Sequence, residues 1–170
     1  MMNKIYQTSY SKKSFNNKYG VPISLFNLKQ NDKIGIFEVG MDKKGEIDFL
    51  TRKIMPDVGI ITNISYAHIK NFNNLKGVAN AKSELINNIT ENGTIILNAD
   101  DKFFKFFKSK SIKNKLNIIS FGIQKKSDVS LIKIKKGKSL SIINIKYHEK
   151  ELIFIIKKNL ESYVYNILST

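Results

Sequence analysis

The sequence contains no cysteine and only one arginine, Arg52, among its 170 residues. The absence of cysteine excludes disulfides, zinc–thiolate sites and thiol nucleophiles. No segment approaches the about 18 uninterrupted apolar residues that a membrane-spanning helix needs. The N-terminal stretch MMNKIYQTSYSKK also lacks the apolar core of a secretory signal. We therefore expect a soluble, cytoplasmic protein without a membrane partner.

The scarcity of arginine decides how the net charge of +15 is interpreted. A dedicated nucleic-acid binder uses arginine for guanine edges and phosphates, with aromatic residues interleaved as stacking platforms. Here 28 of the 29 basic residues are lysines at alternate or scattered positions, as in LIKIKKGKSLSIINIKYHEK (131–150). This spacing indicates lysines on the solvent-exposed face of a sheet and no dedicated nucleic-acid surface, so we expect no nucleic-acid partner. Residues 101–170 carry a net charge of +11 and residues 1–100 only +4, and an anionic substrate could exploit that field.

Apolar runs alternate with helical patterns as far as Gly122. Continuous apolar runs separated by helices are typical of a parallel sheet covered on both faces. With 42% hydrophobic residues, the chain is long enough for one domain with a sizeable core. The expected strands are 33–39, 58–64, 93–99 and 116–122, and the expected helices are 45–54, 75–89 and 100–109.

The pattern changes after Gly122 to a period of two residues, in segments 128–134, 139–147 and 151–157. Such segments, separated by short polar turns, indicate antiparallel hairpins attached to the sheet edge. The sequence therefore predicts a single α/β domain over residues 1–170. Its fold is a mostly parallel, doubly wound sheet with an antiparallel extension at 128–157.

Polar residues lie at the carboxyl ends of the expected parallel strands, where sheets of this kind bind ligands. Glu38 closes the first strand, His68 follows the second, and Asp100 and Asp101 follow the third. Apolar neighbours surround Glu38, so we expect it to be nearly buried and paired, hydrogen-bonded or bound to a metal. The structural alternatives are a salt bridge for Glu38 and a helix cap for His68. Lys82, taken alone, is one more solvated lysine.

A resemblance to a known family bears on these alternatives. Residues 36–86 resemble the central ATPase domain of the Mur ligases. The motifs EVGMDKKGEI, PDVGIITNISYAH, GVANAKSE and ILNADD occur in the family's order, and SFNNKYGVPISL (14–25) precedes them. These motifs are most similar to the branch of the family that uses D-alanyl-D-alanine. The resemblance implies an ATP-dependent ligase of peptidoglycan precursor synthesis.

The resemblance also implies a metal site. In the family pattern, the residues at the positions of Glu38 and His68 bind Mg²⁺, and Lys82 is carbamylated by CO₂ so that its new carboxylate serves the same site. An unmodified ammonium group would repel Mg²⁺, whereas a carbamate supplies the oxygen ligands that Mg²⁺ prefers. The small Ala79 and Ala81 leave room for the modification. ATP and Mg²⁺ are the implied cofactors, and Glu38, His68 and Lys82 are the implied catalytic residues.

The implied reaction has two steps. ATP phosphorylates the terminal carboxylate of a UDP-MurNAc-tripeptide, and the amine of D-alanyl-D-alanine then attacks the acyl phosphate, forming a peptide bond as phosphate leaves. The resemblance places Asn16 and Asn17 near the peptidyl substrate, and Asn166 at the adenine. The family usually has a His-Asn pair where this sequence has Ser162 and Tyr163.

The family's phosphate-binding loop, a glycine-rich turn ending in Gly-Lys-Thr/Ser, is expected before residue 14, where this sequence has no match. Gly40 and Gly45 have the G-x₄-G spacing, but Glu46 and Ile47 follow, so the lysine and the hydroxyl are missing. We expect a fragment that lacks the N-terminal UDP-sugar domain and the C-terminal domain and is inactive alone. Another chain is a candidate source of the missing parts.

Two other interpretations stay open. The first is a non-catalytic remnant of the same fold that binds anions or a partner through its basic second half. The second is a ligase similar to folylpolyglutamate synthase, although GMDKKGEI and NNKYGVP argue against it.

Overall fold

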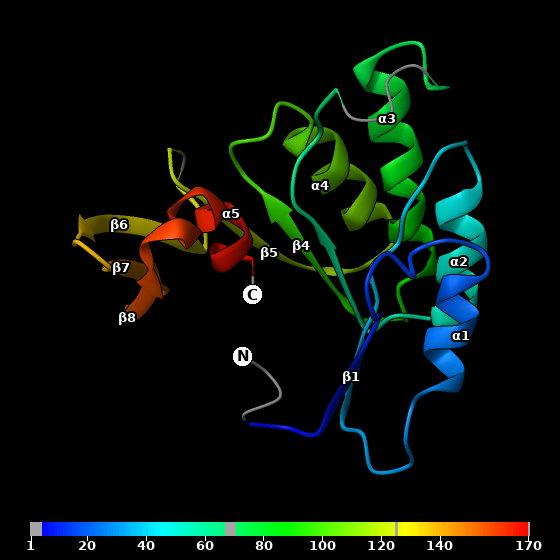
Figure 1. The fold of residues 1–170 in the computed structure, drawn as a ribbon. Helices are drawn as coiled ribbons and strands as arrows, with labels where there is room; N and C mark the ends of the chain where they lie inside the picture. The colour runs from blue at the N-terminus through cyan, green and yellow to red at the C-terminus, as the bar shows by residue number, and fades with distance from the viewer. Residues whose placement is uncertain (1–4, 67–70, 125, 170) are drawn as a thin grey trace. The chain divides into compact units, whose positions relative to one another are not determined.

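The computed structural model describes residues 5–66, 71–124 and 126–169. The chain divides into two compact units, and Figure 1 labels helices and strands of both. The first unit comprises Met1–Pro56 and Tyr66–Asn88, and the second comprises Asp57–Ser65 and Ile89–Thr170. Among the described residues, no helix is long and apolar enough to cross a membrane.

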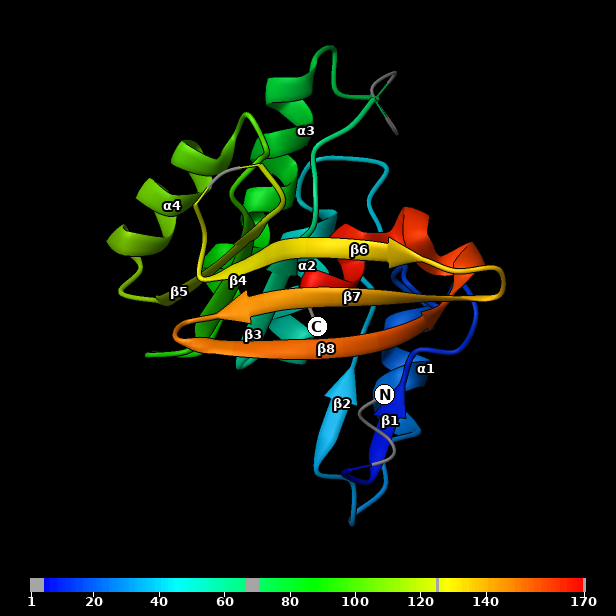
Figure 2. The ribbon, with the colours of Figure 1, turned by 90° about the vertical axis from the view of Figure 1, so that its left-hand side faces the viewer.

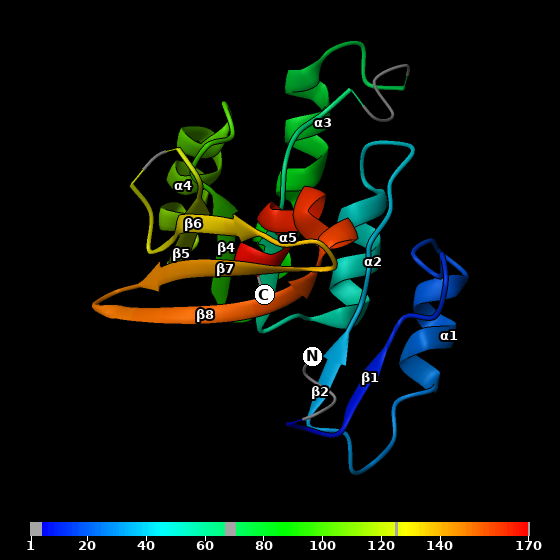
Figure 3. The same ribbon diagram turned by 60° about the vertical axis from the view of Figure 1, so that its left-hand side comes forward.

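The first unit has very short strands. Two of them pair in parallel, with Thr8 opposite Ile34 and Tyr10 opposite Ile36, and they run side by side in Figure 3. Helices supply most of the buried apolar side chains of this unit, including Val21, Leu50 and Val78. Its elements are β1 (Thr8–Tyr10), α1 (Gly20–Phe26), β2 (Ile34–Ile36), α2 (Glu46–Ile54), α3 (Leu75–Lys82) and the 3₁₀ helix η3 (Ser83–Asn88).

Local signals explain why α2 forms where it does. Gly45, with a φ of 90°, turns the chain into the helix, and Met55, with a φ of 48°, ends it in the left-handed region. Ile47 and Leu50 fall on one buried face. The first turn carries Glu46 and Asp48, and the last carries Arg52 and Lys53, which complements the helix dipole.

The second unit contains a sheet in the order β3-β4-β5-β6-β7-β8. Strands β3 to β6 pair in parallel, although β5 and β6 share only the pairs Phe121–Val129 and Gly122–Ser130. Strands β6, β7 and β8 form an antiparallel meander (Figure 2). The elements are β3 (Val58–Ile61), β4 (Thr94–Asn98), α4 (Phe104–Lys113), β5 (Asn117–Gly122), β6 (Val129–Lys136), β7 (Leu140–Tyr147), β8 (Lys150–Lys157), the 3₁₀ helix η4 (Lys158–Tyr163) and α5 (Val164–Leu168).

Alternation along β7 builds the core of the meander. Ile143 and Ile145 point to the face covered by α5, where they pack with Phe121, Val164 and Leu168. The intervening residues of β7, at 140, 142 and 146, are exposed. The period of two in the sequence therefore corresponds to one buried and one solvent-exposed face of the meander.

The predicted fold class, a mostly parallel α/β sheet with an antiparallel extension, is confirmed. The expected first strand (33–39) is shorter than predicted, and it pairs with β1, which the pattern did not indicate. The helix expected at 100–109 starts at Phe104, because Asp101 accepts the backbone N–H of Phe103 and Phe104 and holds this stretch as a turn. The helix expected at 75–89 is α-helical only as far as Lys82.

Candidate active site

Glu38 lies two residues beyond the end of β2 and is exposed. The expectation that it is nearly buried was wrong. The reason is that β2 has only three residues and, in the described part of the first unit, a single neighbouring strand. The side-chain amide of Asn16 donates a hydrogen bond of 2.9 Å to Oε1 of Glu38. That contact fixes one carboxylate oxygen and leaves lone pairs on both oxygens for a cation.

The two asparagines of the predicted substrate loop have different surroundings. The main chain around Asn16 contacts the segment after β2, because the N–H of Gly40 donates to the carbonyl of Asn16 at 2.7 Å. A Cβ at Gly40 would lie 3.0 Å from the Asn16 amide carbon, so glycine permits this approach. Oδ1 of Asn17 accepts the N–H of Tyr19 and of Gly20, each at 3.0 Å, at the start of α1. Asn16 thus orients Glu38, whereas Asn17 shapes the turn before α1.

Lys82 is the last residue of α3 and is half-buried. Ala79 and Ala81, which precede it, are buried in the core of the first unit. Asn74 caps the start of the helix, because its side chain accepts the N–H of Gly77 at 2.9 Å. Lys82 therefore stands at the point where the α-helix gives way to the 3₁₀ turn, at the end of a well-capped helix.

Glu84 has a role that the sequence did not reveal. Its Oε1 accepts the N–H of Gly45 at 2.8 Å, and its Oε2 accepts the N–H of Asp48 at 3.1 Å. A carboxylate at this position satisfies free donors of the first turn of α2 and complements the helix dipole. Glu84 stands two residues after Lys82, so the motif that contains the lysine is tied to the start of α2. In the sequence, Glu84 was only one more charged residue, with nothing to indicate that it contacts α2.

Glu46 orders the loop that follows Glu38. Its Oε2 accepts the N–H of Asp42 at 2.6 Å and of Lys43 at 2.9 Å. These two backbone hydrogen bonds favour the ionised form and lower the pKa of Glu46 below its ordinary value of 4.5. The motif EVGMDKKGEI is therefore a loop held at one end through Glu38 and Asn16 and at the other through Glu46.

The predicted metal site needs residues that the structure does not all describe. His68 lies outside the described residues. Within 5–66, 71–124 and 126–169, no three His, Cys, Asp or Glu side chains are grouped to hold a metal ion. The chemistry of the described members fits the prediction, because Glu38 offers carboxylate oxygens and a carbamylated Lys82 would offer more. The assignment of Glu38, His68 and Lys82 to one metal site stays a prediction.

The carboxylates of Asp100 and Asp101 accept hydrogen bonds from separate segments of the second unit. Asp100 accepts the N–H of Ile123 at 2.6 Å and the hydroxyl of Tyr165 at 3.2 Å. Asp101 accepts the N–H of Ile64 at 2.7 Å. These contacts join the ends of β3, β4 and β5 to α5. Both carboxylates therefore have a structural role at the strand ends.

Asn166 lies on α5, next to Tyr165, and is exposed. Burial is the main cause that raises the pKa of Tyr165 above its ordinary value of 10.0, with a smaller contribution from the Asp100 charge. The hydrogen bond from Tyr165 to Asp100 fixes the helix that presents Asn166 to solvent. An adenine contact by Asn166 stays a prediction.

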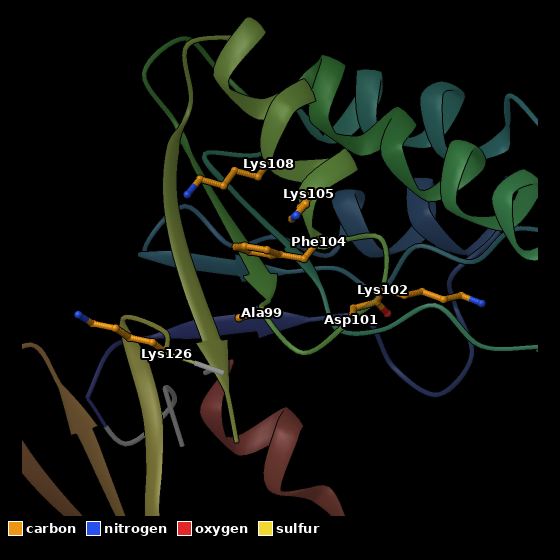
Figure 4. A pocket seen from close by; sticks show the side chains of 7 residues that line it. All are labelled: Ala99, Asp101, Lys102, Phe104, Lys105, Lys108 and Lys126. Carbon is orange, nitrogen blue, oxygen red and sulfur yellow. The ribbon is translucent and has the colours of Figure 1, made fainter. Parts of the chain in front are cut away.

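The second unit also has a basic cavity of about 410 Å³ beside α4. In Figure 4, Lys105, Lys108 and Lys126 surround the ring of Phe104, while Lys102 extends the other way. In the described chain, none of these ammonium groups has a carboxylate within salt-bridge distance. The spacing of lysines three residues apart along α4 was visible in the sequence, but the contribution of Lys126 was not. The lining residues are Ala99, Asp101, Lys102, Phe104, Lys105, Lys108 and Lys126.

The whole chain matches a described protein family. The sequence profile of the Mur ligase middle domain matches residues 1–170. The UDP-N-acetylmuramoyl-tripeptide–D-alanyl-D-alanine ligase of Buchnera aphidicola subspecies Acyrthosiphon pisum is 43% identical over 113 residues, which are 66% of this chain and 24% of that ligase. The ligase of the same name from Bacillus subtilis is 40% identical over 88 residues, 52% of this chain and 19% of that ligase. The matched part thus spans about a quarter or less of these relatives.

Solved structures show the same fold. A MurF crystal structure from Acinetobacter baumannii superposes with a TM-score of 0.89 at 25% identity, over 99% of this chain and 36% of that one. The MurF ligase of Thermotoga maritima, solved in complex with ADP, has a TM-score of 0.78 at 20% identity, over 99% of this chain and 38% of that one.

Proposed function

This chain belongs to the Mur ligase family, and we propose that it is the central, ATP-binding part of a ligase that joins D-alanyl-D-alanine to UDP-MurNAc-tripeptide. The observation that carries the proposal is the identity of 43% and 40% to two relatives that both bear the name of that ligase. The folylpolyglutamate synthase of L. casei shares the fold at 11% identity and a TM-score of 0.67. It is a more distant neighbour, and the alternative based on it has less support.

Each described site residue has a defined task in the proposed mechanism. Glu38, oriented by Asn16, would offer carboxylate oxygens to a bound cation. Lys82, as a carbamate at the end of α3, would add further oxygen ligands, and His68 would be the third residue that holds the metal. Bound Mg²⁺ would neutralise the charge that develops during phosphoryl transfer.

The loops that carry these residues must hold their positions, because small misplacements of positioning groups cost rate. The carboxylates of Glu46 and Glu84 supply that rigidity, because they accept the backbone N–H groups of Asp42 and Gly45, respectively. The proposed reaction also needs a phosphate-binding loop and groups that hold both substrates. We propose that these lie in other parts of the ligase, on the same or a second polypeptide.

A chimera tests the proposal. Residues 36–101 replace the corresponding stretch of the Bacillus subtilis ligase, and phosphate release is measured with ATP, UDP-MurNAc-tripeptide and D-alanyl-D-alanine. We expect release that depends on D-alanyl-D-alanine and falls by about 10²-fold or more in Glu38→Gln and in Lys82→Arg, which cannot use the carbamate.

The matched control is Glu91→Gln, an exposed carboxylate in the same segment, which should leave turnover unchanged. An active chimera that tolerates Lys82→Arg would refute the assigned role of Lys82. The isolated chain should show no turnover. Turnover in the isolated chain that disappears in His68→Ala would show that residues 1–170 suffice.

The basic cavity favours a second candidate function, the binding of phosphate-rich anions without catalysis. Lys105, Lys108 and Lys126, none with a carboxylate partner in the described chain, line a cavity of about 410 Å³ beside the ring of Phe104. Tripolyphosphate should bind the chain and lose affinity in the double variant Lys105→Glu/Lys108→Glu. The control Lys133→Glu/Lys135→Glu removes the same charge from β6. Equal losses of tripolyphosphate affinity in both variants would indicate a general effect of net charge and would contradict a binding site at the cavity.

A further inference from the structure

Strand β8 is the last strand of the six-stranded sheet. On one side it pairs with β7 along its whole length, from Tyr147–Lys150 to Leu140–Lys157. On its other side, no strand pairs with it in the part of the chain that the structure describes (Figure 2). Its eight residues therefore present a row of unpaired backbone N–H and C=O groups, which is a template for another strand.

The face of the meander that points away from α5, here called the outer face, is apolar at its centre. Ile142 and Ile155 are opposite each other, with Leu140 and Ile153 at either side of that pair. Their exposed fractions are 37% for Ile142, 53% for Leu140, 66% for Ile153 and 68% for Ile155. Large apolar side chains thus remain in water directly beside the unpaired edge.

We propose that a second copy of the same chain covers this edge, with β8 paired antiparallel to β8 of the second copy about a two-fold axis at Phe154. In that register, residues equidistant from Phe154 lie opposite each other. Ile153 then lies opposite Ile155 of the second copy, and Glu151 lies opposite Lys157 of the second copy. Each of these pairs occurs twice by symmetry.

Charge complementarity selects this register. An axis at Ile153 would place Glu151 opposite Ile155 of the second copy, and an axis at Ile155 would place Lys157 opposite Ile153. Only an axis at Phe154 matches the acidic residue to a basic one and the apolar residues to each other. Cross-strand pairs of opposite charge and of apolar side chains both stabilise a sheet.

Two-fold symmetry also closes the assembly. The contact uses the unpaired edge of β8 in both copies, so a third copy finds no such edge and the assembly ends at a dimer. Lysines stand only at the two ends of β8, at 150 and 157, and the six residues between them carry one charge, on Glu151. The usual protection of an edge by charged residues is therefore confined to the strand ends.

Sedimentation equilibrium of the 170-residue chain, from micromolar to submillimolar concentration, tests the proposal. The apparent mass should rise from 19.5 kDa toward twice that value. The variant Lys157→Glu turns both ion pairs of the dimer into repulsive pairs and should raise the dissociation constant about tenfold. Within its own chain, residue 157 lies opposite Leu140, so this variant creates no like-charge pair there.

Mixing two variants gives the sharpest readout. Lys157→Glu and Glu151→Lys should each dimerise poorly alone, but an equimolar mixture should form a heterodimer in which both charge pairs are restored. Glu151→Lys also places a lysine opposite Lys146 of its own chain, so recovery on mixing, and not the loss in this variant alone, is the deciding result. Phe26→Lys, at a side chain that is 92% exposed on α1 in the first unit, should leave dimerisation unchanged. A chain that stays monomeric, assembles without limit, or shows no recovery on mixing would overturn the proposal. Circular dichroism confirms that each variant is folded.

Discussion

In the first unit, carboxylates that accept backbone N–H groups hold the chain at the start of α2: Glu46 accepts that of Asp42, and Glu84 accepts that of Gly45. In the meander of the second unit, long strands bury one face against a helix, where Ile143 packs with Phe121 of β5, both fully buried. The strands of the first unit have three residues each, and those of the meander have eight. The loops of the first unit therefore depend on polar contacts for the order that the meander obtains from burial.

This comparison predicts that loss of apolar volume has its largest effect in the second unit. Phe121→Ala removes a fully buried ring and should lower the free energy of unfolding by about 3–5 kcal/mol. Urea unfolding followed by circular dichroism measures the change. The control Phe26→Ala, at an exposed ring, should have little effect. Comparable losses for both variants would contradict the assignment of Phe121 to the buried core of the second unit.

The next largest effect is expected from Glu84→Gln in the first unit. The amide keeps one acceptor, but the charge that serves two N–H groups of the first turn of α2 is lost. Hydrogen bonds to charged groups contribute about 1.5–3 kcal/mol each, so protection of the α2 amides against hydrogen exchange should fall by about 10-fold or more. Amides of β4 and β5 should keep their protection. Uniform loss across both units would show that Glu84 acts globally.

The smallest effect concerns pH and the loop held by Glu46. The folded-state pKa of Glu46 is lowered from 4.5, so its contribution to stability is present above the unfolded value and is lost as pH falls through the folded pKa. The amide NMR signals of Asp42 and Lys43 should therefore titrate with a midpoint below 4.5, and Glu46→Gln should abolish that titration. A midpoint at or above 4.5 would contradict the two hydrogen bonds.

The regular elements of the second unit were predictable because their patterns are simple. The period of two placed β6, β7 and β8 within two residues of their observed bounds at each end. Strand β1 was missed because three residues, TSY, carry no periodic signal. The start of α4 was misplaced because the carboxylates of Asp100 and Asp101 were assigned to its first turn. They instead accept main-chain donors from distant segments.

Only site residues that lie within recognised sequence motifs could be predicted. Glu38 was predicted as a site residue from its place at a strand end, and Glu38, Lys82 and Asn16 were all predicted through the family resemblance; these roles stay predictions. The exposure of Glu38 was not predicted, because it depends on how many strands flank β2. The bond from Asn16 to Glu38 joins residues 22 positions apart. Glu84 contacts residues 36 and 39 positions away. No local pattern specifies such partners.

The register of the strands has a consequence for the order in which the second unit folds. In the meander, partners are close along the chain, as Tyr147 and Lys150 are, so each pairing closes a short loop. Pairing of β3 with β4 must bring Val58 to Thr94, across the whole of α3 and η3. Because closing a longer loop costs more entropy before any contact is gained, we expect the meander to form first and β3 to join the sheet late. During synthesis on the ribosome, β3 would then emerge before β4 and stay unpaired until the rest of the sheet has formed.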